Sequence, residues 1–575
     1  MNVSKLYGKH LFNAGFNINT NNIDQAILAG SITFSPFQTA DLQNPGRTGS
    51  DLASFLLGVP VGGTRRLQVG GENGGWVSGF HVGDRWKVSD RLTINYGIRV
   101  DRTLPPQWGV VSDKSAFVGS LNLNKGEFWL RKMPPFCSQA GKAPCIPGNA
   151  LPEDVIIAPN NRIHQNRDFN IGPRLGFAFR LSNRTVIRSA GGIFYDNWAI
   201  WTQAAQSYGS GWPQVTLLQT VNQNPDVPTV RAFNPLSSIG AGALPAPTPF
   251  TSPQTYKDPF LKVPYTPEWN FGIQHQLDAN TGLSVDYVGS HGTRLDLNTF
   301  ANTARTPGPG PQIDRRPIRY LTPTNYERSD GYSVYHALET SLKRQPAKGV
   351  GFLISYTWGK SIDLSCSGWA GVEGCANQDP YNTRADRSVS SYDVTHVFNT
   401  SLIWELPFGR GRSFSTGNRA ADYVIGNWQL NTIMVLRSGV PYTLGVSGDI
   451  ANTGNSNSAG FYARLNLVGN AKLPNPSPAQ WFNTQAFAAP AAFTYGNMGR
   501  NAMRSDWSKN VDLSLFRVFP IGERARIEFR AEAFNTTNTP VWGAPVVNFA
   551  NPNFGRVLNV ANTPRQLQGA LKLTF

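Results

Sequence analysis

The chain has 575 residues, of which 40% are hydrophobic, 11% aromatic and 15% charged, and its formal net charge is +16. No apolar run approaches the roughly 18 residues of a membrane-spanning helix, which excludes a helical membrane protein. The Lys and Arg residues are scattered and form no long basic run, so we expect no nucleic-acid partner.

The first ninety or so residues predict several short strands. Four segments have strand-like composition: 11–19, 31–37, 64–69 and 76–88. We expect the last two to pair around the glycine-rich residues 70–75. Residues 51–60 are apolar without alternation and predict a turn or a short helix.

Residues 91–101 form the clearest predicted strand. Its apolar side chains share one parity, and Arg91, Arg99 and Asp101 share the other. A period of two with charges on one side is typical of a strand with one wet face.

Later strands are predicted mostly in pairs. They are 170–181 with 185–196, 266–277 with 283–287, 332–344 with 350–360, 391–406 with 428–444, and 511–519 with 526–533, followed by 565–575. Arg174 and Arg180 oppose the apolar face of their strand. In the terminal hairpin the charged face carries Arg526, Glu528, Arg530 and Glu532.

The connections between these strands alternate in length. Long ones lie at 104–169, 198–263, 294–330, 362–390, 447–507 and 537–562, and shorter ones at 182–183, 279–280, 345–348, 407–426 and 520–523. Outer-membrane barrels have short periplasmic turns and long external loops. The sequence therefore predicts an all-β fold, a transmembrane antiparallel β-barrel with about 16 strands, long extracellular loops and short periplasmic turns. The terminal aromatic, Phe575, suits the last strand of such a barrel and predicts a C-terminal assembly signal.

The four cysteines form two local pairs, Cys137 with Cys145 and Cys366 with Cys375. Both pairs fall on the long-loop side, and neither has the spacing of a zinc site. Two disulfides in an oxidising compartment are one interpretation, and four unrelated free thiols are the other.

Four stretches carry a family resemblance: residues 86–99, 265–270, 356–363 and 529–538. The first resembles a hairpin that is frequent in the barrels of TonB-dependent outer-membrane receptors. The other three resemble the Oar-like branch, whose members carry a carboxypeptidase-regulatory-like N-terminal domain. The resemblance implies a location in the Gram-negative outer membrane, with lipid, the barrel-assembly machinery, the TonB system and an extracellular solute as partners.

The sequence also departs from that family. Its members have a signal peptide, a TonB-contacting segment, a plug domain and a barrel of about 22 strands. Neither a plug nor a signal peptide is visible here. We therefore expect residues 1–575 to be the C-terminal part of a longer barrel, with unpaired edges that prevent a stable closed pore.

No enzyme motif is found, and we expect neither catalysis nor a cofactor or metal. The inward charges have two interpretations: a solvated lumen wall, or a surface that contacts a plug or an anionic solute. Aromatic residues near strand ends predict interfacial girdles, namely Trp86, Tyr96, Trp269, Tyr287, Trp358, Trp404 and Trp428.

Transport of a solute by a TonB-dependent barrel is the leading functional hypothesis. The solute class, whether siderophore, oligosaccharide or peptide, is left open by the sequence. A passive porin-like channel or a surface adhesin on the same scaffold is the first alternative. A secreted soluble β-protein that binds polysaccharide is the second.

Overall fold

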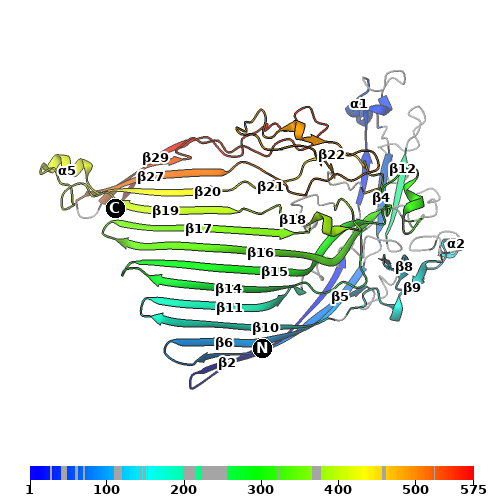
Figure 1. Cartoon of the computed structure of the whole chain (residues 1–575), viewed down its shortest axis with the longest axis horizontal. Coiled ribbons are helices and arrows are strands. Elements are labelled where there is room, and N and C mark those ends of the chain that lie inside the picture. Colours follow the sequence, from blue (N-terminus) through cyan, green and yellow to red (C-terminus); the bar gives the residue numbers. More distant parts are fainter. Residues whose placement is uncertain are drawn as a thin grey trace.

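The computed structural model describes residues 1–575 apart from 26–28, 40–47, 59–61, 69–70, 109–118, 141–145, 147–150, 152, 167, 198–214, 222–254, 320, 322, 365–376, 456–461 and 523–524. Long strands lie side by side in one large curved sheet (Figure 1). Within the described ranges, no helix combines the length and the apolarity that crossing a membrane requires.

The large sheet contains 17 of the described strands, and two of these, β13 (Thr255–Lys257) and β18 (Ser388–Val389), are short additions at its rim. The other strands form the wall. They are β1 (Asn2–Tyr7), β2 (His10–Gln25), β5 (Gly71–Lys87), β6 (Leu92–Trp108), β10 (Asp168–Ser182), β11 (Thr185–Tyr195), β14 (Tyr265–Gln276), β15 (Thr281–Ala301), β16 (Thr324–Ala347), β17 (Val350–Asp363), β19 (His396–Glu405), β20 (Trp428–Arg437), β27 (Ser508–Ile521), β28 (Ala525–Phe534) and β29 (Gln566–Thr574).

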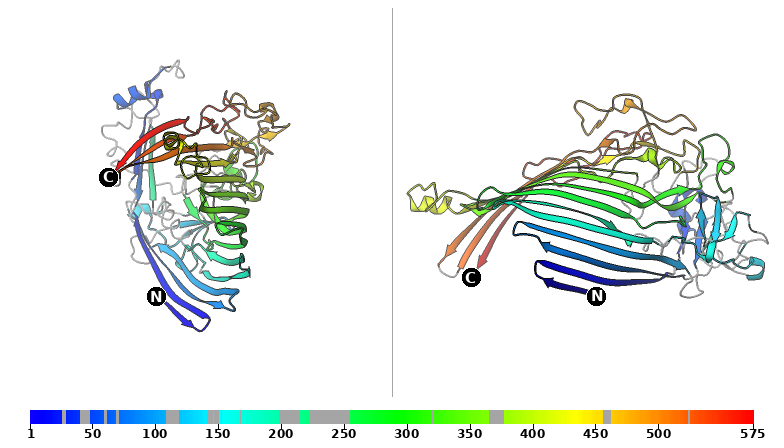
Figure 2. Two further views of the ribbon diagram at one scale, coloured as in Figure 1. Left: turned by 90° about the vertical axis from the view of Figure 1, so that its left-hand side faces the viewer. Right: turned by 60° about the horizontal axis from the view of Figure 1, so that its bottom comes forward.

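Each wall strand pairs antiparallel with the next one along this series. The wall has fifteen strands, which are the 17 of the sheet without β13 and β18. Because strand direction alternates and fifteen is an odd number, β1 and β29 run in the same direction. These two strands are the edges of the wall, and no pairing joins them within the described part of the chain. Viewed along the strands, the wall is a trough that does not close on itself (Figure 2).

The cross-strand register keeps the two faces of the wall separate. Tyr96 lies opposite Leu175, and Phe529 lies opposite Leu571, so apolar side chains follow one another across the convex face. Leu571 is 75% exposed, which is the arrangement of a side chain that meets lipid rather than a protein core. The predicted alternation is thus confirmed as a fold with one apolar and one polar face.

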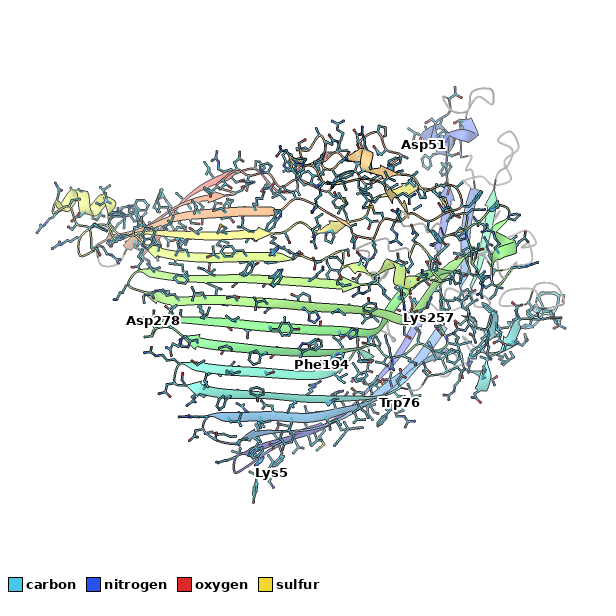
Figure 3. All side chains as sticks on the ribbon, in the orientation of Figure 1. Lys5, Asp51, Trp76, Phe194, Lys257 and Asp278 are labelled. Carbon is cyan, nitrogen blue, oxygen red and sulfur yellow. The ribbon has the colours of Figure 1, made fainter. Side chains whose placement is uncertain are left out.

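The short turns gather at one end of the wall and the long loops at the other (Figure 3). Asp278 marks the turn between β14 and β15, where its carboxylate accepts hydrogen bonds from the Asn280 amide at 2.7 Å and the Thr281 hydroxyl at 2.9 Å. Lys257 marks the opposite end. By the loop-length rule, the turn end is periplasmic and the loop end is extracellular.

The extracellular loops are folded and carry small sheets of their own. Their strands are β3 (Ala29–Thr33), β4 (Gly62–Gln68) and β12 (Val215–Val221); β7 (Gly119–Asn122), β8 (Glu127–Leu130) and β9 (Val155–Ile157); and the pairs β21 (Pro441–Tyr442) with β26 (Met503–Arg504), β22 (Gly445–Ser447) with β23 (Tyr462–Arg464), and β24 (Asn466–Leu467) with β25 (Phe487–Ala488). Helical segments are η1 (Pro36–Thr39), α1 (Asp51–Leu56), α2 (Cys137–Ala140), η3 (Pro159–Asn161), η5 (Gln312–Arg315), η7 (Thr383–Asp386) and η8 (Thr484–Ala486), with α5 (Arg419–Ile425) at the turn end.

Two apolar cores hold these loops together. The first joins Leu121 and Phe128 to Tyr256 and Tyr326, so it fastens β7 and β8 to the outer end of β16. The second gathers Leu444, Leu465, Phe482 and neighbouring side chains from the loop that follows β20. The first core therefore spans the loops and the outer ends of β15 and β16, whereas the second lies in the loops.

Several sequence predictions were wrong in detail. Residues 64–69 do not pair with 76–88, because β4 pairs with β3 and β12 whereas β5 pairs with β2 and β6. The glycines at 71, 74 and 75 continue β5 instead of forming a turn, since cross-strand pairing to β2 compensates for their weak strand preference.

The strand ends also differ from the prediction. The loop predicted at 294–330 is shorter, because β15 extends to Ala301 and β16 begins at Thr324. The strand predicted at 391–406 begins at His396, and the one at 428–444 ends at Arg437. Residues 51–60 are predicted to form a turn or a short helix, and the structure has the short helix α1 over Asp51–Leu56.

We expect the two edge strands to exchange their backbone amides much faster than the centre of the wall. Among the described residues, only one side of β1 and of β29 is paired, so opening an edge breaks fewer contacts than opening β15 or β16. In the folded full chain, hydrogen–deuterium exchange of β29 should be about a hundredfold or more faster than that of β16. Equal protection of the two strands would show that the edges are paired.

Candidate functional site

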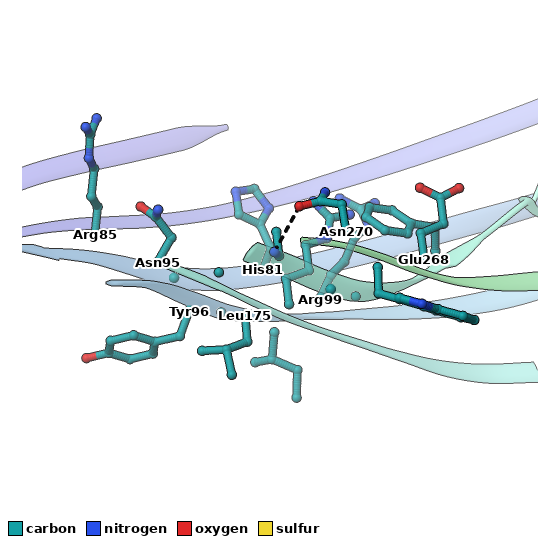
Figure 4. A pocket seen from close by; sticks show the side chains of 18 of the residues that line it. His81, Arg85, Asn95, Tyr96, Arg99, Leu175, Glu268 and Asn270 are labelled. Carbon is teal, nitrogen blue, oxygen red and sulfur yellow. Dashed lines mark hydrogen bonds between the residues drawn. The ribbon is translucent and has the colours of Figure 1, made fainter. Parts of the chain in front are cut away.

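The concave face of the wall carries a concavity of about 780 Å³, which apolar and polar groups line together. Residues from β2, β5, β6, β10, β11, β14, β15 and β16 line it. Its labelled polar side chains, among them His81, Arg85, Arg99 and Asn270, rise on one side of the sheet, whereas Tyr96 and Leu175 lie on the other side (Figure 4). The concavity therefore belongs to the inner face and not to the apolar surface.

Small residues form the floor of this concavity: Gly83, Gly97, Gly176, Ala190 and Gly192. Gly83 and Gly97 lie directly opposite each other on β5 and β6. A Cβ on Gly97 would stand 2.8 Å from the carbonyl oxygen of Val82, closer than side-chain carbons approach. The floor is thus nearly bare backbone, and the glycines keep it open.

Charged side chains stand around this floor. Arg99 binds Asp101 through two hydrogen bonds of 2.9 and 2.8 Å and also donates to Asn17 at 3.0 Å. Arg174 lies 4.7 Å from the centre of the Phe194 ring. Within the described residues, Arg174 has no carboxylate partner, so it leaves positive charge in the concavity.

A second, smaller concavity of about 280 Å³ continues the first toward the loop end. The two share Arg99, Arg174 and Phe194. In the second one, Asn197 accepts a hydrogen bond from the Thr103 hydroxyl at 2.7 Å. The polar side chains of the two concavities thus follow one another along the inner wall toward the extracellular loops, and together they are called the polar track.

The other predicted inward charges are spread over the wall. Arg180 shares the inner parity of Arg174 but lies near the turn end of β10, and Arg91 lies in the turn before β6 and not on the strand. In the terminal hairpin, Glu528 pairs with Arg530, whose guanidinium lies 5.0 Å from the Phe516 ring.

Register places Arg526 and Glu532 on the face that carries Glu528. The structure therefore brings Arg99, Asp101 and Arg174 together, and it leaves the β28 charges on a separate part of the wall.

Phe575 directly follows β29 and is 93% exposed. Cys137 begins α2, whereas Cys145, Cys366 and Cys375 lie outside the described residues, so the disulfides remain predictions.

Three ion pairs that the sequence pattern does not reveal fasten one external loop to another. Arg464 meets Asp386 at 2.6 Å, Arg504 meets Asp393 at 2.6 Å, and Arg500 pairs with Asp363. All three arginines come from the loop after β20, and the aspartates come from the end of β17 and the loop that follows it. No local signal in the sequence connects residues so far apart along the chain.

The first external core includes a buried pair of opposite charges. Lys257 of β13 lies 2.5 Å from Glu327 of β16, and Lys257 is fully buried. Burial lowers the pKa of Lys257, and the carboxylate of Glu327 opposes that shift. His164, also buried, has its pKa lowered to about 3 by desolvation and by the charge of Lys257.

The family model that describes the outer membrane β-barrel domain matches residues 1–568. The chain belongs to this family. This barrel protein accordingly resides in the outer membrane, with its apolar convex face toward lipid and its polar track inside. The predicted fold class and location are confirmed. No curated protein matches the sequence.

Solved structures similar to the barrel are distant from it. One is the outer membrane transporter YddB from Escherichia coli, which is 10% identical; the match covers 99% of this chain and 52% of that chain, with a TM-score of 0.45. A second is the FrpB iron transporter from Neisseria meningitidis, which is 9% identical; the match covers 100% of this chain and 54% of that chain, with a TM-score of 0.41. A third is the ferric yersiniabactin uptake receptor FyuA from Yersinia pestis, which is 10% identical; the match covers 99% of this chain and 56% of that chain, with a TM-score of 0.36. The chain spans about half the length of these proteins.

Aromatic rings and histidines form contacts on the lipid face of the barrel. Toward the loop end, the Tyr287 hydroxyl lies 2.8 Å from Nδ1 of His336, and the Tyr356 hydroxyl lies 2.9 Å from Nδ1 of His396. His396 in turn stacks on Trp507. His396 begins β19, and an amphipathic ring at a strand end suits the boundary between lipid and water.

An acidic residue also lies on the lipid face, near the turn end. Asp84 is buried, with Oδ2 at 2.7 Å from Nδ1 of His10, and it accepts a hydrogen bond from the Tyr96 hydroxyl at 3.0 Å. The His10 ring stacks between Phe12 and Trp86. These neighbours shield the carboxylate from lipid.

We expect Gly97→Ala to destabilise the barrel by about 1–3 kcal/mol, because the new methyl group collides with the backbone of β5. Gly569→Ala on β29 is the matched control, since a Cβ at this position would have nothing within 4 Å. The midpoint of urea unfolding in detergent measures the stability of both variants. Equal midpoints for the two variants would contradict the close approach of β5 and β6.

We expect the module around His164 to lose stability in acid. The pKa of His164 is about 3 in the folded protein and about 6.5 in the unfolded chain. Below pH 6.5 the unfolded chain therefore takes up a proton that the folded protein excludes. The loss should reach roughly 3 kcal/mol at pH 4.5. Protease protection of residues 119–166 should therefore fall between pH 6.5 and 4.5, and less so in His164→Gln. The same fall in both proteins would contradict this assignment.

Proposed function

We propose that the chain forms most of the wall of an outer-membrane transporter that imports a solute with energy from the TonB system. The observation that supports this most directly is the polar track on the inner face, which leads from the concavity to the extracellular loops. The solute would be an iron chelate, an oligosaccharide or a peptide. Its passage would follow the face opposite to lipid.

The inner charges supply a means of recognition. Arg85 and Arg174 have no carboxylate partner among the described residues, whereas Glu268 provides one acidic group at the same site. Unpaired guanidinium groups bind carboxylates and phosphates of a ligand, or acidic side chains of a plug. We therefore assign these residues to contact with a solute or plug, and the paired Arg99 and Asp101 to the wall itself.

We further propose that residues 1–575 are the C-terminal part of the barrel and that other strands complete it. Since β1 and β29 run the same way, direct closure would give a parallel pair. An all-antiparallel closure needs an odd number of additional strands, and seven would give the 22 strands of the large transporters. A plug inside the completed barrel would transmit energy from TonB, and Phe575 would be read by the assembly machinery.

A surface adhesin is the second candidate, and the folded external loops favour it. Two apolar cores and three inter-loop ion pairs give a rigid surface that a partner outside the cell can bind. A passive channel shares the same wall and lacks only the energy coupling. The outer-membrane family leaves the soluble polysaccharide-binding alternative without support.

Depletion of solutes from the growth medium tests the three possibilities together. Cells that express the native gene, cells without it and cells without TonB are compared by mass spectrometry of the spent medium. Transport predicts a solute whose depletion requires both the gene and TonB. A passive channel predicts depletion that persists without TonB, and an adhesin predicts none. Arg85→Gln with Arg174→Gln should slow depletion, whereas Arg526→Gln is the control on the same face.

A further inference from the structure

The connection between β19 and β20 differs from the other described turns at the periplasmic end. Residues 406–427 form a folded projection, the rim knob, that contains α5 and extends beyond the ends of the strands (Figure 1). Asn418 caps the N-terminus of α5, and its side chain accepts hydrogen bonds from the amides of Ala420 at 2.9 Å and Ala421 at 3.2 Å. Asp422 is buried and accepts from the Thr416 amide at 2.7 Å and from the Ser415 hydroxyl. The knob is therefore a preformed structure.

The rim knob is fastened to the lipid face of the wall. Arg517 of β27 is 3% exposed, and its guanidinium lies 5.3 Å from the ring of Tyr423, 5.5 Å from that of Trp428 and 4.2 Å from that of Phe519. It also donates a hydrogen bond to the carbonyl of Val424. Arg517 lies opposite Trp428 and Phe529, so it has the outward parity. The knob thus continues the membrane-facing surface past its periplasmic rim.

Apolar side chains of the knob are open to solvent. Tyr423 is 55% exposed and Val424 is 64% exposed, and Ile425 follows them in the same helix. Phe408 and Phe414, which contact each other, are also exposed. Because the knob is rigid, it cannot bury these side chains by folding onto itself.

Basic side chains accompany this apolar surface. Arg410 and Arg419 are exposed, and Arg412 is held by Glu405 at 2.9 Å. The acidic group of the knob itself, Asp422, is buried among hydroxyls and amides. The exposed surface is therefore both apolar and positive, the combination by which peripheral segments bind anionic lipid.

We propose that the rim knob docks on the periplasmic leaflet of the outer membrane. Tyr423, Val424 and Ile425 enter the boundary between headgroups and acyl chains, and Arg410 and Arg419 bind lipid phosphates. Continuity with the lipid-facing surface, through Arg517, makes lipid the occupant. The inference rests on the outer-membrane location and not on the transport proposal.

Spin-label accessibility tests this docking in the full chain. The four cysteines are replaced by serine, and a nitroxide is attached to Val424→Cys. Leu571→Cys on the outward face of β29 is the lipid-exposed control, and Gln568→Cys on its inward face is the water-exposed control. Proteins are folded into vesicles of phosphatidylethanolamine with phosphatidylglycerol, or of phosphatidylcholine alone. Collisions with oxygen report lipid, and collisions with a water-soluble nickel chelate report water.

The nitroxide at 424 should behave like that at 571 in the anionic vesicles, with oxygen collisions severalfold above the level at 568. Arg410→Gln with Arg419→Gln should move it toward water, since each arginine near an anionic surface contributes about fivefold to binding. Nickel accessibility at 424 equal to that at 568 overturns the proposal. Shielding from both reagents also overturns it, because a protein contact would then cover the knob.

Discussion

Arg464→Met is expected to destabilise the extracellular loops by about 3–5 kcal/mol, because it leaves the Asp386 carboxylate buried without its partner. Arg464 and Asp386 are 7% and 3% exposed at their side chains, so water cannot replace the lost contact. Burial already raises the pKa of Asp386, and Arg464 is the strongest of the groups that lower it again. Protease resistance of the loop after β20, measured against urea, reports the loss.

A matched control distinguishes the effect of leaving a buried charge without its partner from the effect of removing one positive charge. Arg412→Met removes the partner of Glu405 in a pair whose side chains are 36% and 48% exposed, and this change should cost under about 1 kcal/mol. The double variant Arg464→Met with Asp386→Asn should recover part of the loss, since no charge then stays buried. Equal losses for Arg464→Met and Arg412→Met would mean that the loops are not held by the buried pair.

Leu515→Arg should destabilise the barrel in a bilayer by about 2–4 kcal/mol, because the side chain would lie on the lipid face near the middle of β27. Ser514→Arg, one residue away on the inner face, should be tolerated because Glu532 lies opposite it. Folding into vesicles of graded thickness, followed by urea titration, compares the two variants. If Ser514→Arg were the less stable variant, the inner and outer faces would be the reverse of those assigned here.

The wall could be predicted from the sequence because its signal is local. In β6 every second side chain is apolar, so a short window reveals the strand, its faces and the inward position of Arg99. The terminal hairpin is predictable for the same reason. The failures lie where the local signal is absent: Gly71–Gly75 in β5 has no alternation, and its strand exists because β2 supplies the pairing partner.

The site was only partly predictable. Parity placed Arg99, Asp101 and Arg174 on one face, but the concavity depends on glycines of different strands coming into register, such as Gly83 and Gly97. The inter-loop ion pairs join residues about 80 to 140 positions apart, as Arg464 does with Asp386. Which charges meet is decided by how the loops fold over the wall, and the sequence pattern does not encode that arrangement.

The contact of His10 with Asp84 bears on the order in which the barrel is built. Before β2 is added to β5, the Asp84 carboxylate has Tyr96 as its hydrogen-bond donor but lacks the imidazole of His10 and the ring of Phe12, which lies opposite it. An uncovered carboxylate resists transfer from water into hydrocarbon. The N-terminal hairpin therefore acts as a cover whose arrival favours membrane insertion of β5 and β6, so this side of the wall is expected to enter the bilayer as a unit.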